Sequence, residues 1–176
     1  MYLSIDIETT GLDPEKHQIL QVAGVLWDHQ DVMKCSWFDF KIKWDQLTGS
    51  PFALNMNKDL LANMKHADYE IEALGDAVRS WLAGRGVKKV YPLGCNVGGF
   101  DMQFLKRVPG WPKELFSYRC LEVGTLYANA LSIPSLSSVI KDHGLRVYAQ
   151  RIPGKPHEAL YDARLALLAA SKKLKR

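Results

Sequence analysis

Residues 4–12 read SIDIETTGL and set two acids, Asp6 and Glu8, two positions apart in an otherwise apolar segment. Successive side chains of a β-strand point to opposite faces, so both carboxylates point one way while Ile5 and Ile7 point the other. A segment this apolar predicts a central strand that is covered on both faces. Neighbouring ionised carboxylates repel each other there unless a positive charge lies between them. A divalent cation such as Mg²⁺ or Mn²⁺, which prefers oxygen ligands, meets that requirement.

A second interpretation puts the two acids at the solvent-exposed end of an edge strand, where they need no cation. The residues that follow favour the first interpretation. Thr9, Thr10 and Gly11 form a turn signal directly after the acids, and a glycine there permits a close approach of the backbone to a ligand. The strand is therefore expected to end at a binding site.

Length and composition predict one domain. The chain has 176 residues, of which 47% are hydrophobic, and this is enough for a sizeable core. We expect a single domain over residues 1–176 that ends in a frayed, solvated basic tail at about 172–176. The net charge of +4 permits a polyanionic partner, but the tail supplies much of the excess, so charge alone supports nucleic acid binding weakly.

Cysteine usage and hydropathy limit the classes of protein to which the chain can belong. Cys35, Cys95 and Cys120 lie far apart without a CxxC pair, which favours free thiols in a reducing compartment over a zinc cluster or disulfides. A strand pattern begins within two residues of Met1, and no apolar run reaches the length of a membrane span. We therefore expect a soluble, intracellular, cytoplasmic protein with no membrane partner.

The remaining patterns predict an α/β domain. After the first strand, strands are expected at 18–28, 35–44, 88–95 and 118–123, and helices at 57–64, 70–83, 100–107, 124–129 and 135–144, with a terminal helix entered through 155–162. This order describes a mixed five-stranded sheet flanked by helices. In the segment 35–44, aromatic residues alternate with lysines, and the period of two favours a core face over a nucleic-acid platform.

Two further acids lie at helix starts. Asp101 follows a loop with two glycines, and Asp162 is expected at the entrance of the terminal helix, five residues after His157. An acid at a helix start is commonly a cap or a partner of the helix dipole, and for Asp101 taken alone that structural interpretation is favoured. The spacing of the other pair lets His157 lie above Asp162 at the helix entrance.

Three segments together resemble the motifs of the DEDDh 3′-to-5′ exonucleases, which have an RNase H-like fold. They are residues 6–12, 96–101 and 157–162, in the expected order along the chain. A single DxE pair is a weak signal, but three ordered motifs in a chain of fitting length are a strong one. The tyrosine version of the third motif requires a tyrosine where this chain has Glu158, so the resemblance is to the histidine version.

The resemblance implies an active site. It assigns Asp6, Glu8, Asp101 and Asp162 as catalytic ligands of two Mg²⁺ or Mn²⁺ ions and His157 as the general base. It also implies a single-stranded 3′ end as the nucleic acid partner and nucleoside 5′-monophosphates as products. The chemistry is consistent, because two cations about 3.5–4 Å apart stabilise the attacking and leaving oxygens of a phosphodiester. An imidazole accepts a proton near neutral pH.

The same resemblance implies substrate contacts from Thr9, Thr10, Leu12, Asn96 and Phe100, with Leu12 against the terminal base. For Leu12 and Phe100, ordinary core packing is an equal alternative.

The nature of the polymer is open. Residues 118–126 are similar to a stretch of the oligoribonucleases, which degrade very short RNA as dimers, but Glu122 and Gly124 stand where that family usually has Asp and Ser. No residue signals recognition of a 2′-hydroxyl. We favour single-stranded DNA ends, as in trimming beside a polymerase or another replication or repair partner, with short RNA and a homodimer as the alternative. An inactive nucleic-acid-binding subunit is disfavoured because all four acids and the histidine are present.

Overall fold

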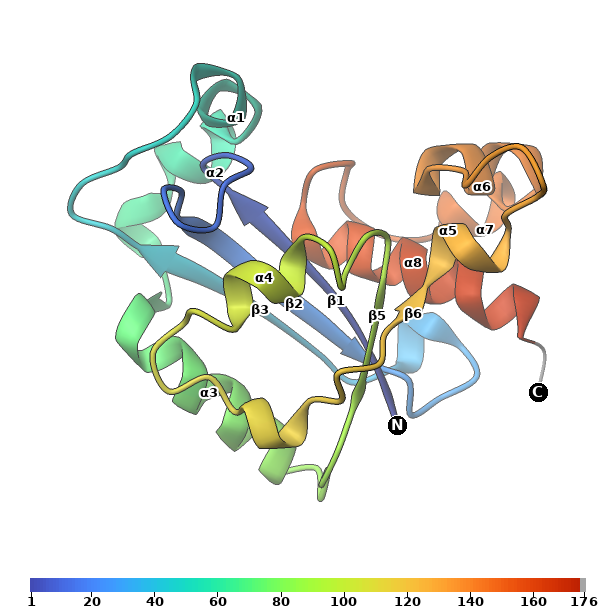
Figure 1. Ribbon diagram of the computed structural model, residues 1–176, viewed down its shortest axis with the longest axis horizontal. Helices are drawn as coiled ribbons and strands as arrows, with labels where there is room; N and C mark the ends of the chain where they lie inside the picture. Colours follow the sequence, from blue (N-terminus) through green and yellow to red (C-terminus); the bar gives the residue numbers. More distant parts are fainter. Residues whose placement is uncertain (175–176) are drawn as a thin grey trace.

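The computed structural model describes residues 1–174 and shows a six-stranded mixed sheet with helices on both faces (Figure 1). In the spatial order β4-β3-β2-β1-β5-β6, the strands are Tyr69–Glu70, Trp37–Lys43, Ile19–Leu26, Tyr2–Thr9, Tyr91–Gly94 and Leu121–Glu122. β2 is antiparallel to β1 and β3, whereas the pairs β1–β5, β5–β6 and β3–β4 are parallel. The α/β class with a mixed sheet is confirmed.

The helices are mostly short. They are α1 (Pro51–Met56), α2 (Lys58–Ala62), α3 (Ile71–Ala83), α4 (Asp101–Leu105), α5 (Val123–Leu126), α6 (Leu136–Asp142), α7 (Arg146–Ala149) and α8 (Ala159–Lys173), with 3₁₀ turns η1 (Val32–Lys34), η2 (Met64–His66) and η3 (Lys113–Leu115). Within residues 1–174, no helix combines the length and the apolar character that crossing a membrane requires. The three cysteines are free thiols, as expected.

β1 lies inside the sheet between β2 and β5, so the edge-strand interpretation of its acids is wrong. Ile5 and Ile7 are buried in a cluster with side chains of α3 and α4. On the opposite face, the Ser4 hydroxyl donates a hydrogen bond to the Ala163 carbonyl of α8 at 2.7 Å. Each buried isoleucine contributes about 1.5–3 kcal/mol to stability, which fixes the register of the strand and therefore the face of its acids.

β3 confirms that its aromatic face is core. Phe38 is buried, stacks on Phe40 with ring centroids 4.8 Å apart, and meets the edge of Trp81 from α3 at 5.0 Å. Trp37, on the other face, is 48% exposed. The period-two pattern of 35–44 was therefore a reliable guide to packing.

The sixth strand, β4, was not predicted. Its two residues pair with the end of β3, and Asp68 just before it is tied to Lys41 twice. The Asp68 N–H donates to the Lys41 carbonyl at 2.9 Å, and the Asp68 carboxylate accepts from the Lys41 N–H at 2.8 Å. Backbone pairing of two residues leaves no periodic pattern in the sequence.

Several predicted bounds are wrong. The short helix expected at 57–64 is present as α2, within those bounds. The preceding helix α1 was not expected, and its N-cap Ser50 accepts a hydrogen bond from the Ala53 N–H at 3.2 Å. α5 ends at Leu126 rather than at 129, and α7 was not expected. Lys172 and Lys173 form the last turn of α8, so a frayed tail from 172 is wrong for these two residues. Positions 175–176 lie outside the described residues.

Candidate active site

The two acids of β1 face α8 near the end of the strand. Glu8 is 6% exposed and Asp6 is partly exposed. Both lie on the Ser4 face of the alternating strand, which is the face that α8 covers. The alternation read from the sequence therefore puts both carboxylates beside the beginning of α8.

The middle acid is fixed directly to β1. Asp101 is the first residue of α4 and is 4% exposed. Its Oδ1 accepts a hydrogen bond from the Ile7 N–H at 3.0 Å, and Ile7 lies between Asp6 and Glu8. This contact spans 94 positions of sequence, and it brings the Asp101 carboxylate to β1 between the two acids of that strand, which a helix cap would not require.

The last acid and the histidine close the site. Asp162, in the first turn of α8, accepts a hydrogen bond at its Oδ2 from the His157 N–H at 2.9 Å. His157 has φ of 65°, a left-handed conformation that few residues adopt without support. Ligand atoms of Glu8, His157 and Asp162 all lie within 4.8 Å of one another. The structure therefore places the histidine at the helix entrance, as its spacing from Asp162 predicted.

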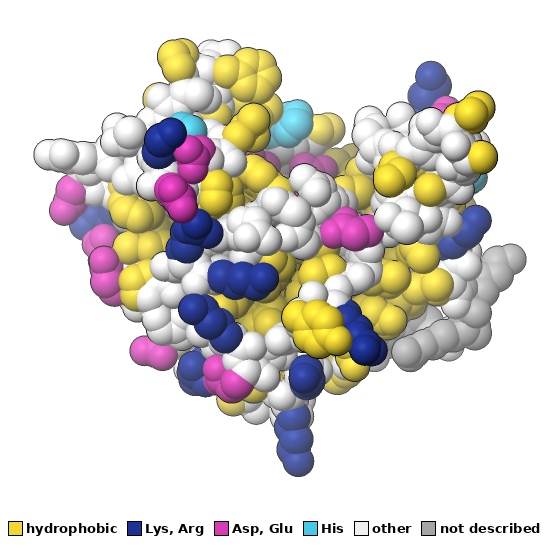
Figure 2. Space-filling view, viewed as in Figure 1, with side chains coloured by type: hydrophobic (Ala, Val, Ile, Leu, Met, Phe, Trp, Pro, Cys, Tyr) yellow, Lys and Arg dark blue, Asp and Glu magenta, His cyan; other side chains and the backbone are white. Residues whose placement is uncertain are grey.

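Figure 2 shows this region as a hollow in which acidic side chains and a histidine lie between two lobes. Comparison with Figure 1 identifies the lobes as the one formed by α1 and α2 and the one formed by α5, α6 and α7. His157 is exposed and Asp6 and Asp162 are partly exposed, so a ligand can reach the cluster from this side.

Burial is the largest cause that raises the pKa of each carboxyl group in the cluster, and the charges of neighbouring acids add to the rise. Burial, followed by the charges of the three other acids, holds the pKa of Asp6 well above its usual range. Burial and the charge of Asp162 raise the pKa of Glu8 to about 7. Burial raises the pKa of Asp101 to about 8, and it also raises the pKa of Asp162. The surrounding side chains therefore supply too little positive charge to stabilise four ionised carboxylates.

The donor set fits a hard divalent cation. No ion pair within residues 1–174 engages any of the four carboxylates. Carboxylate oxygens are the ligands that Mg²⁺ and Mn²⁺ prefer, and a cation would relieve the repulsion that raises the pKa values. Glu8, Asp162 and His157 form the tightest group, and Asp6 and Asp101 adjoin it.

A model of the exonuclease family matches residues 3–169, which include all four acids and the histidine. The chain belongs to the exonuclease family. The probable oligoribonuclease of Drosophila melanogaster is 28% identical over 127 residues, covering 69% of this chain and 60% of that protein. The oligoribonuclease of Aliivibrio fischeri is 28% identical over 136 residues, covering 69% of this chain and 70% of that protein. This exonuclease-family chain thus spans about three-fifths of the fly protein's length.

Solved structures share the fold. The nuclease domain of 3′hExo, described as a DEDDh family member bound to rAMP, has a TM-score of 0.72 and 18% identity, covering 99% of this chain and 91% of that chain. A structure of exonuclease I has a TM-score of 0.75 and 19% identity, covering 99% of this chain and 40% of that chain. The RNase H-like fold implied by the three motifs is confirmed.

The residues expected to contact substrate around the first turn have distinct surroundings. The Thr9 hydroxyl donates to the Gly11 carbonyl at 2.7 Å, and the Thr10 hydroxyl donates to the Thr48 carbonyl at 2.6 Å. Both hydroxyls therefore hold the turn after β1. Leu12 is 82% exposed, so core packing is wrong as an account of this residue.

The other two expected contacts lie on the loop before α4. Asn96 is exposed and has φ of 61°, and Phe100 is partly buried with its ring centroid 5.1 Å from that of Phe104. Core packing thus accounts for part of the Phe100 surface. Contact of any of these residues with substrate stays a prediction.

Sequence reasoning missed Asn57, which supports the site from between α1 and α2. Asn57 is 3% exposed, and its Nδ2 donates to the Thr9 carbonyl at 3.2 Å. Its side chain also hydrogen-bonds Glu8, which opposes the rise in the pKa of that carboxyl. The segment around Asn57 has no regular pattern, so nothing in the sequence indicated that this amide is buried.

Glu122 supports the site from the other side. Its carboxylate accepts hydrogen bonds from the Val97 N–H at 3.2 Å and the Gly98 N–H at 2.9 Å, and so fixes the loop that leads to Asp101. Its charge also helps to raise the pKa of Asp101. The sequence marked Glu122 as a departure from oligoribonucleases but gave no sign of this role.

We expect the metal-free protein to lose stability as the pH rises from about 4.5 to about 8. The pKa of Glu8 rises from 4.5 to about 7 and that of Asp101 from 3.8 to about 8. In this window the folded state keeps protons that the unfolded chain has released, so the stability present at low pH is lost as the pH approaches the folded-state values. Each unit of difference corresponds to about 1.4 kcal/mol.

Divalent cations should reverse this loss, because they bind the ionised carboxylates. Thermal denaturation with EDTA or MgCl₂ across the same pH range measures both effects. The gain in melting temperature from Mg²⁺ is expected to grow with pH, and a gain that stays constant or falls as the pH rises would overturn this prediction.

Proposed function

We propose that the chain is a divalent-cation-dependent 3′-to-5′ exonuclease that removes nucleoside 5′-monophosphates from single-stranded nucleic acid. The observation that carries this proposal is the meeting of Asp6, Glu8, Asp101, His157 and Asp162 at the end of β1, from the beginning, middle and end of the chain.

Each group of residues has its own role in the proposed reaction. The four carboxylates would hold two Mg²⁺ or Mn²⁺ ions, with Asp101 and Asp162 oriented by their backbone hydrogen bonds. When bound, such a pair of ions supplies Lewis acidity for the attacking and leaving oxygens. His157 lies exposed beside this cluster and takes the proton of the attacking water. In-line attack on the terminal phosphate then breaks its bond to the 3′ oxygen of the preceding nucleotide.

The surface beside the hollow supports a polyanionic partner. Figure 2 shows lysine and arginine side chains gathered below the hollow on the same face. Lys106, Lys113 and Arg119, which follow α4 along the chain, are all exposed. The structural neighbours were solved with an rAMP in 3′hExo and with a dT13 oligonucleotide in exonuclease I, so the shared fold is found with both kinds of ligand.

Single-stranded DNA and short RNA are the two candidate substrates. Short RNA is favoured by the curated relatives, which are named oligoribonucleases. DNA is favoured by a difference at Gly124, where oligoribonucleases usually have a serine. A Cβ at Gly124 would lie 2.8 Å from Cγ2 of Ile133 and 2.9 Å from the Pro134 carbonyl oxygen, so a serine requires a different course of the chain at 133–134.

Hydrolysis of matched DNA and RNA oligomers separates these candidates. The set includes short and long oligomers, in single- and double-stranded form. With Mg²⁺ or Mn²⁺, we expect a 5′-labelled single strand to shorten progressively from its 3′ end and a 3′-labelled strand to release labelled mononucleotide at once. EDTA should abolish both signals. Internal cleavage, or shortening in EDTA, would overturn the proposal, and faster hydrolysis of short RNA than of every DNA oligomer would assign the second candidate.

A further inference from the structure

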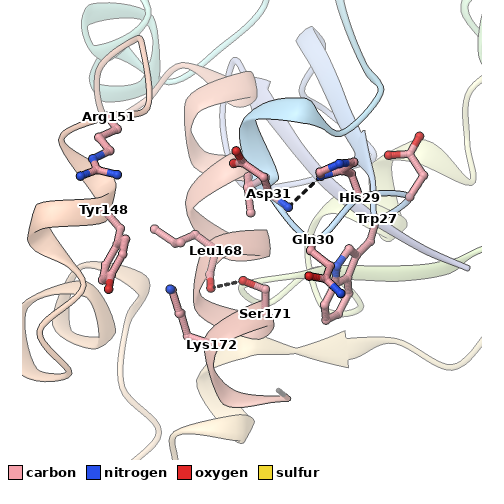
Figure 3. A pocket seen from close by; sticks show the side chains of 11 residues that line it. Trp27, His29, Gln30, Asp31, Tyr148, Arg151, Leu168, Ser171 and Lys172 are labelled. Carbon is pink, nitrogen blue, oxygen red and sulfur yellow. Dashed lines mark hydrogen bonds between the residues drawn. The ribbon is translucent and has the colours of Figure 1, made fainter. Parts of the chain in front are cut away.

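A second cavity, of about 630 Å³, lies apart from the acid cluster (Figure 3). Its walls are the segment 27–32 after β2, the end of α7 and the C-terminal half of α8. The α8 residues that line it follow Asp162 by six to ten positions, which is about 9–15 Å along the helix axis. None of the four acids or His157 lines this cavity, and its size is typical of small-molecule sites.

One wall is cationic. Arg151 and Lys172 lie on the α7–α8 side of the cavity in Figure 3, with the ring of Tyr148 beside them. The Lys172 ammonium lies 3.9 Å from the centroid of that ring. Neither cation forms an ion pair with a carboxylate among residues 1–174. Two cations without an acidic partner, one of them an arginine, suit a phosphate group.

The facing wall carries hydrogen-bonding groups. One carboxylate oxygen of Asp28 accepts a hydrogen bond from the Ser36 N–H at 3.1 Å, and one of Asp31 accepts from the Met33 N–H at 3.1 Å. The second oxygen of each carboxylate can accept a hydrogen bond from a ligand. The Nδ1 of His29 accepts from the Asp31 N–H at 2.9 Å, so the neutral ring carries its proton on Nε2 and can donate there. Donors and acceptors of this kind read the edge of a nucleobase.

The floor between the two walls is apolar. Leu168 is 7% exposed and Val32 is 6% exposed, and both line the cavity together with Trp27. A ligand that fills the space therefore needs a flat, largely apolar body with an anionic group at one end and polar edges at the other. An inorganic anion would meet the cations but would leave the floor and the polar wall without a partner.

We propose that this cavity binds a nucleotide, with its phosphate against Arg151 and Lys172 and its base over Leu168, edge toward residues 28–31. The nucleotide is either a free mononucleotide or one unit of a strand, since both present the same chemistry. If the proposed function is correct, the enzyme's own reaction provides such nucleotides. The complementarity between the cavity and a nucleotide is independent of the proposed function.

Titration of the EDTA-treated full chain with adenosine 5′-monophosphate, followed by calorimetry, tests the site. Without cations the acid cluster repels a phosphate, so binding reports the second cavity. We expect one nucleotide per chain and a loss of affinity of at least about tenfold in Arg151→Gln and in Lys172→Gln. Arg146→Gln removes an exposed cation of α7 that does not line the cavity, and this variant should bind as the parent does.

Adenosine and inorganic phosphate should each bind at least about tenfold more weakly than the nucleotide. Adenosine lacks the group that contacts the cationic wall, and phosphate lacks the base that contacts the facing wall. The site is refuted if the nucleotide fails to bind at millimolar concentration, if phosphate binds equally well, or if both glutamine variants keep the parent's affinity. A single-stranded oligonucleotide in the same titration distinguishes the sources: tighter binding that Arg151→Gln weakens supports a strand, and weaker binding supports a free nucleotide. Because no hydrolysis is involved, failure here is separable from failure of the exonuclease assay.

Discussion

Replacing His157 is expected to lower turnover about 10²–10⁴-fold while leaving cation binding nearly unchanged. The structure separates these effects, because His157 contacts Asp162 through its backbone N–H, which any non-proline residue keeps. His157→Ala is the simplest variant, but alanine is poorly suited to φ of 65°. Asparagine tolerates that conformation and is no base near neutral pH, so His157→Asn isolates the loss of the imidazole.

The matched control is His66→Ala, which removes an exposed histidine in η2. Single-turnover hydrolysis of a 5′-labelled strand measures the chemical step, and calorimetric titration with Mn²⁺ measures cation binding. We expect the parent's rate for the control and the parent's Mn²⁺ affinity for His157→Asn. A rate for His157→Asn within a few-fold of the parent's would remove the histidine from the mechanism.

Asp101→Asn should abolish most activity and yet stabilise the metal-free protein near pH 8. The loss of a cation ligand costs several kcal/mol of transition-state stabilisation, and each 1.4 kcal/mol or so is a factor of ten, so turnover should fall about a thousandfold or more. The asparagine Oδ1 can still accept the hydrogen bond from the Ile7 N–H. It carries no charge, whereas burial raises the pKa of Asp101 to about 8 and makes its ionisation unfavourable in the fold.

Asp142→Asn, which changes an exposed acid of α6, is the control for both measurements. Thermal denaturation in EDTA near pH 8 should give a higher midpoint for Asp101→Asn than for the parent, and added Mg²⁺ should narrow or reverse that difference. An Asp101→Asn protein that is active, or that unfolds earlier than the parent in EDTA, would show that Asp101 holds the fold and not a cation.

The face of the β1 acids could be predicted because alternation is a local property. Ile5 and Ile7 are buried on one side, and that burial alone forces Asp6 and Glu8 to the other. The approach of Asp101 to Ile7 is a different matter, since it spans 94 positions and depends on the parallel pairing of β5 with β1. The local sequence pattern indicated only that Asp101 lies at a helix start. Its place beside Asp6 and Glu8 was implied by the resemblance of the three ordered motifs to the exonuclease family.

The supporting residues of the site were not predictable for a related reason. Asn57 and Glu122 act through hydrogen bonds to backbone atoms of distant segments, at Thr9 and at the loop before Asp101. A polar residue in a segment without periodicity looks the same in sequence whether it is buried or solvated. The same limit hid β4, whose pairing with β3 is a matter of backbone contacts.

We expect four carboxylates from three distant segments to hold divalent cations at the end of β1. A crystal structure of the parent with Mn²⁺ and a nucleoside 5′-monophosphate, using the anomalous signal of manganese, tests it directly. The expected result is two manganese peaks about 3.5–4 Å apart, bound by oxygens of Asp6, Glu8, Asp101 and Asp162, with the phosphate between them and His157. Manganese bound elsewhere, or bound without Asp101 and Asp162, would contradict it.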